Sequence, residues 1–262
     1  MTPPGWTLVV LAAGVGRRFG GDKQLVPLGP GGELLSDYSV REALRHGATR
    51  AVFVIRPELE PEFRAHHARW VGQIEVRYVH QNQPTGTTPA VLAAQASIED
   101  RCVILNADDY YGPEAIAAAG AATGPAVISY RLGDTLSASG GVTRAFLETD
   151  EHGWLQRITE VRDVTARGPA SSDQPVSMNC WALPLEAFAL LRKDLESVRR
   201  SHPAQTECAL PETIGRLIAR GELRVQVVPA GRQWIGVTHA LDVPVAQAAL
   251  RQLERSRLTA DS

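Results

Sequence analysis

The chain has 262 residues, of which 44% are hydrophobic and 21% charged, with a net charge of −2. This length suffices for one large α/β domain with a buried core, and the charge gives no reason to expect a nucleic-acid partner. No run of about 18 apolar residues predicts a membrane span. The N-terminus lacks the pattern of a secretory signal, and the three cysteines lack metal-binding or disulfide spacing, so we expect a soluble, cytoplasmic protein with buried thiols.

The first half of the chain alternates apolar strand-like runs with amphipathic segments. Strands are predicted at Leu8–Leu11, Ala51–Ile55, Ile74–Val79 and Cys102–Leu105. Helices are predicted from Ser36 or Asp37 to about His46, at Pro57–Trp70, from Thr87 or Thr88 to about Ser97, and at Pro113–Ala119. This alternation indicates a doubly wound parallel sheet, whose ligands bind at the carboxyl ends of the strands.

The second half is richer in strands and predicts a mixed or antiparallel extension of the sheet. Strands are expected at Ala126–Tyr130, Val142–Thr149, Trp154–Ile158, Val176–Leu183 and Leu223–Val228. A polar loop is expected at Asp163–Gln174, and helices at Leu185–Arg199, at about Glu212–Arg220 and at about Val243–Arg255. The fold class is therefore α/β, with a mostly parallel mixed sheet flanked by helices, in one domain spanning 1–262.

The stretch Leu8–Gln24 carries the strongest functional signal. An apolar strand leads into a turn of small residues that also holds Arg17, Arg18 and Lys23. Small residues let the backbone approach a ligand, and free N–H groups together with cations suit several phosphates. Only two lysines occur in the chain, and one of them lies in this turn. The sequence therefore predicts a polyphosphate site, against the alternative of an ordinary glycine-rich turn.

Two common phosphate motifs do not fit this turn. A dinucleotide fingerprint would need glycine at Phe19, and a Walker loop would need a hydroxyl at Gln24. The remaining pattern, L-A-A-G-x-G-x-R-F-G-G-x-K, resembles the signature loop of nucleotidyltransferases that release pyrophosphate. The resemblance implies a GT-A-like fold, with Arg18 and Lys23 as catalytic residues. It also implies a set of nucleotide-binding residues in the loop, namely Leu11, Ala12, Ala13, Gly14, Gly16 and Arg17.

An acidic segment follows the fourth predicted strand, where Asp108 and Asp109 precede Tyr110 and Tyr111. A carboxylate at this strand end would face the same crevice as the phosphate loop, and Mg²⁺ is usually held by one or two carboxylates plus substrate phosphates. The alternative is an acidic turn that caps the following helix. The segment resembles the L-G-D-N/D-x-x-x-G element of sugar nucleotidyltransferases. This resemblance implies that Asp108 binds Mg²⁺ and that Asp109 supports it on the acceptor side.

Further matches to the same family are weaker. The segment from Gln81 to Ala90 is similar to the glutamine and G-T-A-x-A helix start that hold the base. This implies three nucleotide-binding residues, Gln81, Gly86 and Thr87. On the acceptor side the resemblance implies Glu160, Arg162, Asn179 and Glu207. At each of these four positions, a residue that only satisfies the fold is an equally good interpretation.

One departure from the family pattern affects the metal site. Sugar nucleotidyltransferases carry a second metal-binding aspartate in a W-x-D-x-G-like element, where this chain has Gly236 between Trp234 and Thr238. Asp242 follows shortly and is the candidate substitute. Otherwise Asp108 and the phosphates hold the metal alone.

The resemblance implies a Mg²⁺-dependent nucleotidyltransferase of the EC 2.7.7 type. It would transfer a nucleoside monophosphate from a nucleoside triphosphate to a phosphorylated small-molecule acceptor, with a sugar-1-phosphate as first candidate, and release pyrophosphate. The resemblance also implies that about residues 1–125 bind the nucleotide and that about residues 126–262 form the acceptor pocket and the C-terminal helix. One alternative is cytidylyl or guanylyl transfer to a non-sugar phosphorylated alcohol or a cofactor precursor. A second is a nucleotide-binding regulatory protein with little turnover. Neither nucleic acid nor a membrane is expected as a partner, and a homo-oligomer is left open.

Overall fold

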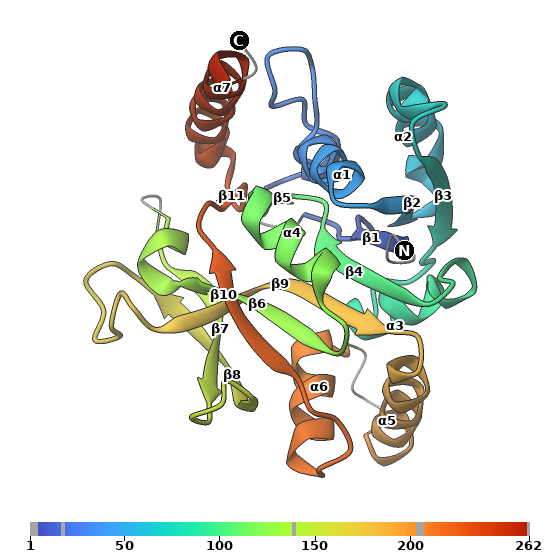
Figure 1. The fold of residues 1–262 in the computed structure, drawn as a ribbon, viewed down its shortest axis with the longest axis vertical. Coiled ribbons are helices and arrows are strands. Elements are labelled where there is room, and N and C mark those ends of the chain that lie inside the picture. The colour runs from blue at the N-terminus through green and yellow to red at the C-terminus, as the bar shows by residue number, and fades with distance from the viewer. Residues whose placement is uncertain (1–4, 17–18, 138–139, 203–206, 261–262) are drawn as a thin grey trace.

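The computed structural model describes residues 5–16, 19–137, 140–202 and 207–260 (Figure 1). Within these residues the main sheet has nine strands, seven of them in the order β10-β6-β9-β4-β1-β2-β3. The remaining two, β7 and β8, form a hairpin that pairs with β9. A separate pair of two-residue strands, β5 (Asp109–Tyr110) and β11 (Ile235–Gly236), lies beside the main sheet.

The first half has the parallel βα organisation that its sequence predicts. Strand β1 pairs in parallel with both β2 and β4, and β2 pairs in parallel with β3. The strands are β1 (Trp6–Leu11), β2 (Ala48–Ile55), β3 (Glu75–His80) and β4 (Arg101–Asn106), and the helices are α1 (Leu35–Arg45), α2 (Glu60–His67), α3 (Thr87–Ala93) and α4 (Pro113–Ala121). Two predicted helices are shorter than expected, because short 3₁₀ turns form their ends at Pro57–Leu59, Ala68–Trp70 and Gln95–Ser97.

The second half makes the sheet mixed, as its strand-rich sequence indicates. Strand β9 is antiparallel to both of its neighbours, β4 and β6, while β10 is parallel to β6. The elements are β6 (Ala126–Arg131), β7 (Val142–Thr149), β8 (Leu155–Val164), β9 (Pro175–Pro184), α5 (Ala187–Ser201), α6 (Leu210–Ala219), β10 (Gln226–Gly231) and α7 (Val243–Ala260).

Strand β8 corrects the sequence prediction at its carboxyl end. The expected strand Trp154–Ile158 continues to Val164, and the loop expected from Asp163 begins correspondingly later. Most β8 side chains after Leu155 are exposed or half-exposed, so the segment lacks the apolar alternation that marks a strand. Its backbone pairing with β7 over the whole length holds it extended.

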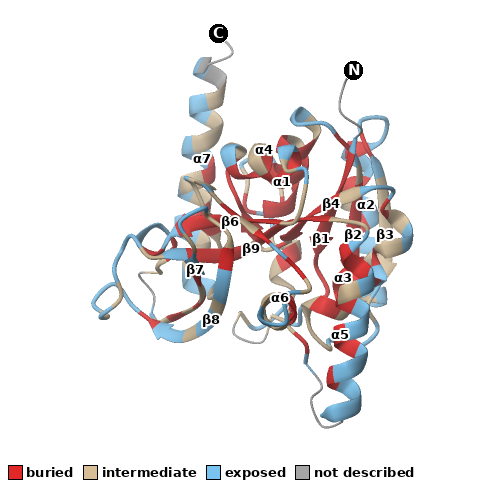
Figure 2. Cartoon of the chain, turned by 60° about the horizontal axis from the view of Figure 1, so that its bottom comes forward, coloured by how far each residue is buried: buried red, intermediate tan, exposed pale blue. Residues whose placement is uncertain are grey.

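Helices cover both faces of the sheet (Figure 2). Alternate residues of β1 point to opposite sides, so Leu8 and Val10 join one core cluster and Val9 joins the other. The first cluster contains residues of α1, α2 and α4, and the second contains residues of α3, α5 and α6. This arrangement is the doubly wound architecture, and it leaves the strand ends open for a ligand.

Helix α7 packs on the body of the fold near α1 (Figure 1). Leu250 is fully buried in a small cluster with Tyr38 and Tyr110. Ion pairs of Arg41 with Glu254, 2.6 Å apart, and of Arg257 with Glu42 join α7 to α1. No helix in the described ranges is long and apolar enough to cross a membrane.

A buried histidine on α2 makes the stability of the fold dependent on pH. His67 is 3% exposed, its ring centroid lies 4.1 Å from that of Phe53, and its Nδ1 is 3.0 Å from the hydroxyl of Tyr78. Burial lowers the pKa of His67 to about 4, because the charged ring would lose its hydration. The neutral ring therefore stabilises the fold above pH 6.5, and this contribution is lost as the pH falls toward 4.

We predict that His67→Phe flattens the acid limb of the stability profile. Between pH 7 and pH 5, protonation of the unfolded chain at His67 should cost the wild type about 2 kcal/mol that the variant does not lose. Urea unfolding at both pH values measures the difference. Other titrating groups are common to both proteins and cancel, so an equal fall in the two free energies of unfolding would contradict the prediction.

Candidate active site

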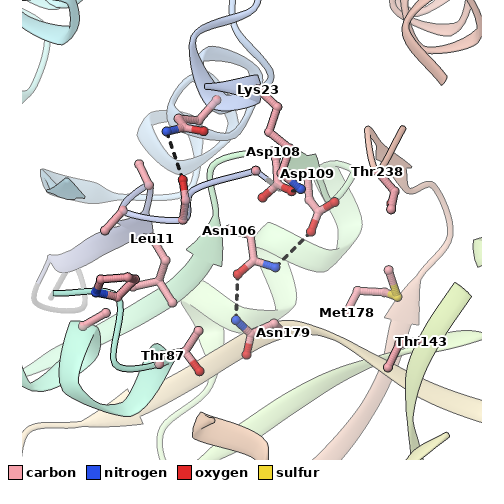
Figure 3. A pocket seen from close by; sticks show the side chains of 18 of the residues that line it. Leu11, Lys23, Thr87, Asn106, Asp108, Asp109, Thr143, Met178, Asn179 and Thr238 are labelled. Carbon is pink, nitrogen blue, oxygen red and sulfur yellow. Dashed lines mark hydrogen bonds and ion pairs between the residues drawn. The ribbon is translucent and has the colours of Figure 1, made fainter. Parts of the chain in front are cut away.

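The carboxyl ends of β1 and β4 open into one cavity of about 680 Å³ (Figure 3). Leu11 and Asn106 are paired in register as the last residues of the two strands. One step further, the N–H of Ala107 donates to the carbonyl of Leu11 at 3.0 Å. The small-residue loop after β1 and the acidic segment after β4 therefore leave the sheet at the same place, as their sequence positions predict.

The loop after β1 lines the cavity with backbone. Its lining residues are Leu11, Ala12, Ala13, Gly14, Val15 and Gly16. Gly16 has φ of +58°, and a Cβ there would lie 2.2 Å from the carbonyl oxygen of Gly21, so this tight turn requires glycine. The buried side chain of Gln24, which the sequence analysis did not single out, lies with its amide nitrogen 3.4 Å from the carbonyl of Gly14. Arg17 and Arg18 lie outside the described residues.

Lys23 and Asp108 meet across the cavity. Their side chains form an ion pair, and each remains 22% exposed. The ammonium group of Lys23 also lies 3.4 Å from the carbonyl oxygen of Val237. The phosphate loop and the end of β4 are thus joined by one cation and one carboxylate, two of the three predicted catalytic residues.

Asp109 occupies a different environment from Asp108. It is 7% exposed, and its Oδ2 accepts a hydrogen bond of 3.0 Å from the side-chain amide of Asn106. The hydroxyl of Tyr111 lies 3.3 Å from the same oxygen. Burial, followed by the charge of Asp108, raises the pKa of Asp109 to about 7, while the hydrogen bond from Asn106 acts in the opposite direction.

Two asparagines connect this carboxylate to β9 through consecutive hydrogen bonds. Asn179 donates from Nδ2 to Oδ1 of Asn106 at 2.7 Å, and its own Oδ1 accepts from the indole N–H of Trp181 at 2.8 Å. Asn179 has φ of +68°, in the left-handed region, and its backbone N–H donates to Oγ of Ser177. Figure 3 shows the two asparagines meeting between the two strands in the cavity.

The wall predicted to hold the base is tied to the segment before α6. Gln81 donates to the carbonyl of Gly86 at 3.0 Å, and Thr87 Oγ1 accepts from the N–H of Leu210 at 2.7 Å. Gly86 has φ of +103°, and a Cβ there would lie 2.3 Å from the carbonyl oxygen of Cys208. Gln81, Gly86, Thr87 and Glu207 all line the cavity, so the structure brings these four predicted residues together.

On the remaining wall the structure separates two predicted residues. Glu160 lines the cavity, whereas Arg162, two residues further along β8, is not among the lining residues and has a side chain that is 81% exposed. Among the described residues, the arginine that lines the cavity is Arg144 on β7, which the sequence analysis missed. Arg144 lies two residues after buried Val142, so the alternation of a strand places both on the buried face and could have identified it.

Arg144 is held firmly although it borders the cavity. It is 8% exposed, and its Nε donates to Oγ1 of Thr135 at 3.1 Å. The guanidinium carbon lies 5.1 Å from the ring centroid of Trp234. With the hydrogen bond from Nη1 to the carbonyl of Thr143, these contacts fix the orientation of the charged group at the wall of the cavity.

Asp242 has a structural role at the start of α7. Its Oδ2 accepts hydrogen bonds from the backbone N–H groups of Thr238 and His239 at 2.9 and 2.8 Å, and its Oδ1 is 3.3 Å from the hydroxyl of Ser137. It is not among the residues that line the cavity. Its Oδ2 is engaged by backbone N–H groups beside the lining residue Thr238.

The donor set of the cavity fits a hard divalent cation such as Mg²⁺. Asp108 and Asp109 supply carboxylate oxygens, and the ammonium group of Lys23 already places a positive charge against Asp108. Among the residues that the structure describes, no cluster of three or more His, Cys, Asp or Glu side chains could hold a metal. A bound Mg²⁺ would therefore take its other ligands from phosphates and water, which is its usual coordination.

A mixed α/β sheet with a small-residue loop, a lysine and a facing carboxylate at the strand ends is typical of the nucleotidyltransferase class. Comparison with family models supports this assignment, since residues 8–135 match the MobA-like NTP transferase domain. This part of the chain belongs to the nucleotidyltransferase family.

The fold agrees with a solved structure over nearly its whole length. The inositol-1-phosphate CTP transferase from T. maritima matches with a TM-score of 0.71 and 14% identity, over 96% of this chain and 98% of that one. This likeness confirms the expected nucleotidyltransferase fold of the GT-A-like type. A comparison with curated proteins gave no match.

We predict that two truncations of Asn179 differ in stability because this residue has a left-handed backbone. Asn179→Ala and Asn179→Gly lose the same side-chain hydrogen bonds, but only alanine meets the steric cost of a Cβ at positive φ. The alanine variant should be less stable than the glycine variant by about 1 kcal/mol. Urea unfolding of both variants measures this, and an alanine variant as stable as the glycine variant would refute it.

Proposed function

We propose that this protein is a Mg²⁺-dependent enzyme that transfers a nucleoside monophosphate from a nucleoside triphosphate to a phosphorylated small-molecule acceptor and releases pyrophosphate. The observation that carries the proposal is the meeting of Lys23 and Asp108 between the small-residue loop and the end of β4. A cation and a strand-end carboxylate at the mouth of a backbone-lined loop suit a triphosphate with its metal.

The residues of the nucleotide half would act by positioning and electrostatics. Backbone N–H groups of the loop and the ammonium group of Lys23 would stabilise the charge that develops on the pyrophosphate leaving group, with Arg18 expected to assist. Mg²⁺ held by Asp108 would neutralise phosphate charge when bound. The attacking acceptor phosphate is already anionic, so its oxygen can attack the α-phosphorus without a general base.

The acceptor half offers a polar wall. Glu160 and Ser177 line the cavity with groups that hydrogen-bond hydroxyls, and Asn179 lies beside them. Arg144 is the described arginine of the lining, and a fixed guanidinium is well suited to a phosphate group. We therefore infer a phosphorylated polyol as acceptor, either a sugar-1-phosphate or a cyclitol phosphate of the kind named for the T. maritima neighbour.

The test is pyrophosphate release with Mg²⁺ across four nucleoside triphosphates and a panel of acceptors. The panel holds sugar-1-phosphates, inositol phosphate, choline phosphate and polyol phosphates. We expect release that depends on one acceptor and falls at least about 100-fold in Asp108→Asn, the scale for loss of one charged transition-state stabiliser.

Asp173→Asn is the matched control, because this carboxylate is exposed on the loop before β9 and pairs with Arg131 outside the cavity. Binding of a triphosphate without release for any acceptor would overturn the proposal in favour of a regulatory nucleotide-binding protein. Release that survives intact in Asp108→Asn would remove Asp108 from the mechanism.

We further predict that Arg144→Gln weakens acceptor use selectively. The KM for the phosphorylated acceptor should rise about tenfold or more, while the KM for the triphosphate changes little, because a charged hydrogen bond to one phosphate is lost. Steady-state kinetics with each substrate varied in turn separates the two constants. Arg157→Gln, an exposed arginine of β8 paired with Glu148, controls for the loss of one positive charge.

The same change at Arg162 tests the expectation from the sequence. A larger effect on the acceptor KM in Arg162→Gln than in Arg144→Gln would assign phosphate binding to Arg162 and contradict the assignment to Arg144.

A further inference from the structure

The short strand β11 (Ile235–Gly236) lies antiparallel to β5 (Asp109–Tyr110), so the pairing of these two strands determines which residue lies opposite Asp109. Gly236 is the register partner of Asp109, and Ile235 is the partner of Tyr110. The N–H of Val237 is 3.3 Å from the carbonyl of Asp108. Position 236, which carries the second metal-binding aspartate in the family pattern, is thus directly opposite Asp109.

Gly236 leaves space that the carboxylate of Asp109 fills. A Cβ at position 236 would lie 2.5 Å from Oδ1 of Asp109 and 2.1 Å from Cζ2 of Trp234. Gly236 is not among the residues with positive φ, so its backbone does not require glycine. A side chain at position 236 and the observed carboxylate of Asp109 are mutually exclusive.

The two oxygens of Asp109 have different surroundings. Oδ2 is anchored by the amide of Asn106, with the hydroxyl of Tyr111 close by. Oδ1 lies over Gly236, and Asp109 itself is among the residues that line the cavity. Such a carboxylate is oriented by one oxygen and can offer the other to a ligand without losing its support.

The immediate surroundings of the two aspartates already hold a cation. The ammonium group of Lys23 pairs with Asp108 and lies 3.4 Å from the carbonyl of Val237, the residue after Gly236. Figure 3 shows the carboxylates of Asp108 and Asp109 next to each other, with the end of Lys23 against Asp108. A positive charge is therefore accommodated where β5 and β11 meet.

We propose that Asp109 supplies the second carboxylate of the divalent-cation site and takes the place of a side chain at position 236. In this arrangement the carboxylate has moved from β11 to the facing strand β5, and glycine at position 236 is what makes room for it. The inference rests on the proposed function for the identity of the metal, and it excludes Asp242 as the second ligand. Two carboxylates with phosphates and water complete the coordination that Mg²⁺ prefers.

The experiment is a titration of the full chain with Mn²⁺ alone, followed by electron paramagnetic resonance of the free ion. We expect Asp109→Asn to weaken Mn²⁺ binding at least about tenfold, since loss even of an outer partner of a metal ligand has effects of that size. Glu160→Gln is the matched control, because it removes one carboxylate from the same cavity but from β8. Mn²⁺ affinity in Glu160→Gln should stay close to that of the wild type.

Gly236→Ala is a second, independent variant. It keeps both aspartates and places a methyl carbon 2.5 Å from Oδ1 of Asp109 and 2.1 Å from Cζ2 of Trp234, so both side chains must shift. It should therefore also weaken Mn²⁺ binding while thermal unfolding shows a folded protein. If Asp109→Asn does not fold, this variant decides the question alone.

Three results would overturn the inference: no Mn²⁺ binding by the wild type, wild-type affinity in the variants at positions 109 and 236, or an equal loss in Glu160→Gln. The outcome is separable from that of the proposed function, because Mn²⁺ binding is measured without substrate. Acceptor-dependent pyrophosphate release with unchanged Mn²⁺ binding in Asp109→Asn would refute only the ligand assignment. Loss of Mn²⁺ binding in that variant, without pyrophosphate release by the wild type, would refute only the reaction.

Discussion

The position of β4 between a parallel and an antiparallel neighbour is the constraint on which the cavity depends. Its parallel register with β1 makes both strands end together, at Leu11 and Asn106. Because β9 is antiparallel to β4 and Trp181 pairs with Ile104, the β9 residues before Trp181 lie at the edge of the sheet where β4 ends. Ligands of open α/β sheets bind where the strand arrangement changes, and here the change of direction lies within the pocket itself.

The backbone pairing of β4 with β9 ends at the cavity, and beyond that point the two strands are connected by side-chain hydrogen bonds. The last described pair between β4 and β9 is Ile104 with Trp181. Beyond it Asn179 adopts a left-handed backbone, and the hydrogen bonds through Asn106 to Asp109 connect the strands instead. A left-handed residue other than glycine costs on the order of 1 kcal/mol, and each buried hydrogen bond offsets a similar amount. These hydrogen bonds join β9 to the carboxylate of Asp109 on β5.

The sequence predicted the first half of the fold because each element there has a strong local signal. Apolar strands such as Ala51–Ile55 are fully buried, and glycines such as Gly47 end the helices between them. The loop after β1 and Asp108 were found because their residue types are unusual together and follow clear strands. Their positions in the cavity then depend only on parallel pairing.

The sequence could not predict features set by tertiary pairing. Strands β5 and β11 have two residues each, too few for any periodicity, and they decide what Gly236 and Asp109 face. Strand alternation places Arg144 on the buried face, but the extent of the cavity along the β7–β8 hairpin, which decides between Arg144 and Arg162, is set by tertiary packing. Asp242 accepts hydrogen bonds from the backbone N–H groups of Thr238 and His239 just before α7. Its position shortly after Gly236 in the sequence does not reveal this role.

The charges around the cavity limit how an anionic substrate can enter it. Four carboxylates, those of Asp108, Asp109, Glu160 and Glu207, and two cations, Lys23 and Arg144, are among the described lining residues. Lys23 is engaged by Asp108, and Arg144 is held by Thr135 and Trp234, so both described cations of the lining already contact other protein groups. A triphosphate would meet the carboxylates of Asp108 and Asp109 at the strand ends, and a divalent cation that arrived with it would reduce this repulsion. That cation would compete with Lys23 for Asp108 and release the ammonium group toward the phosphates, so that metal and lysine act on the triphosphate together.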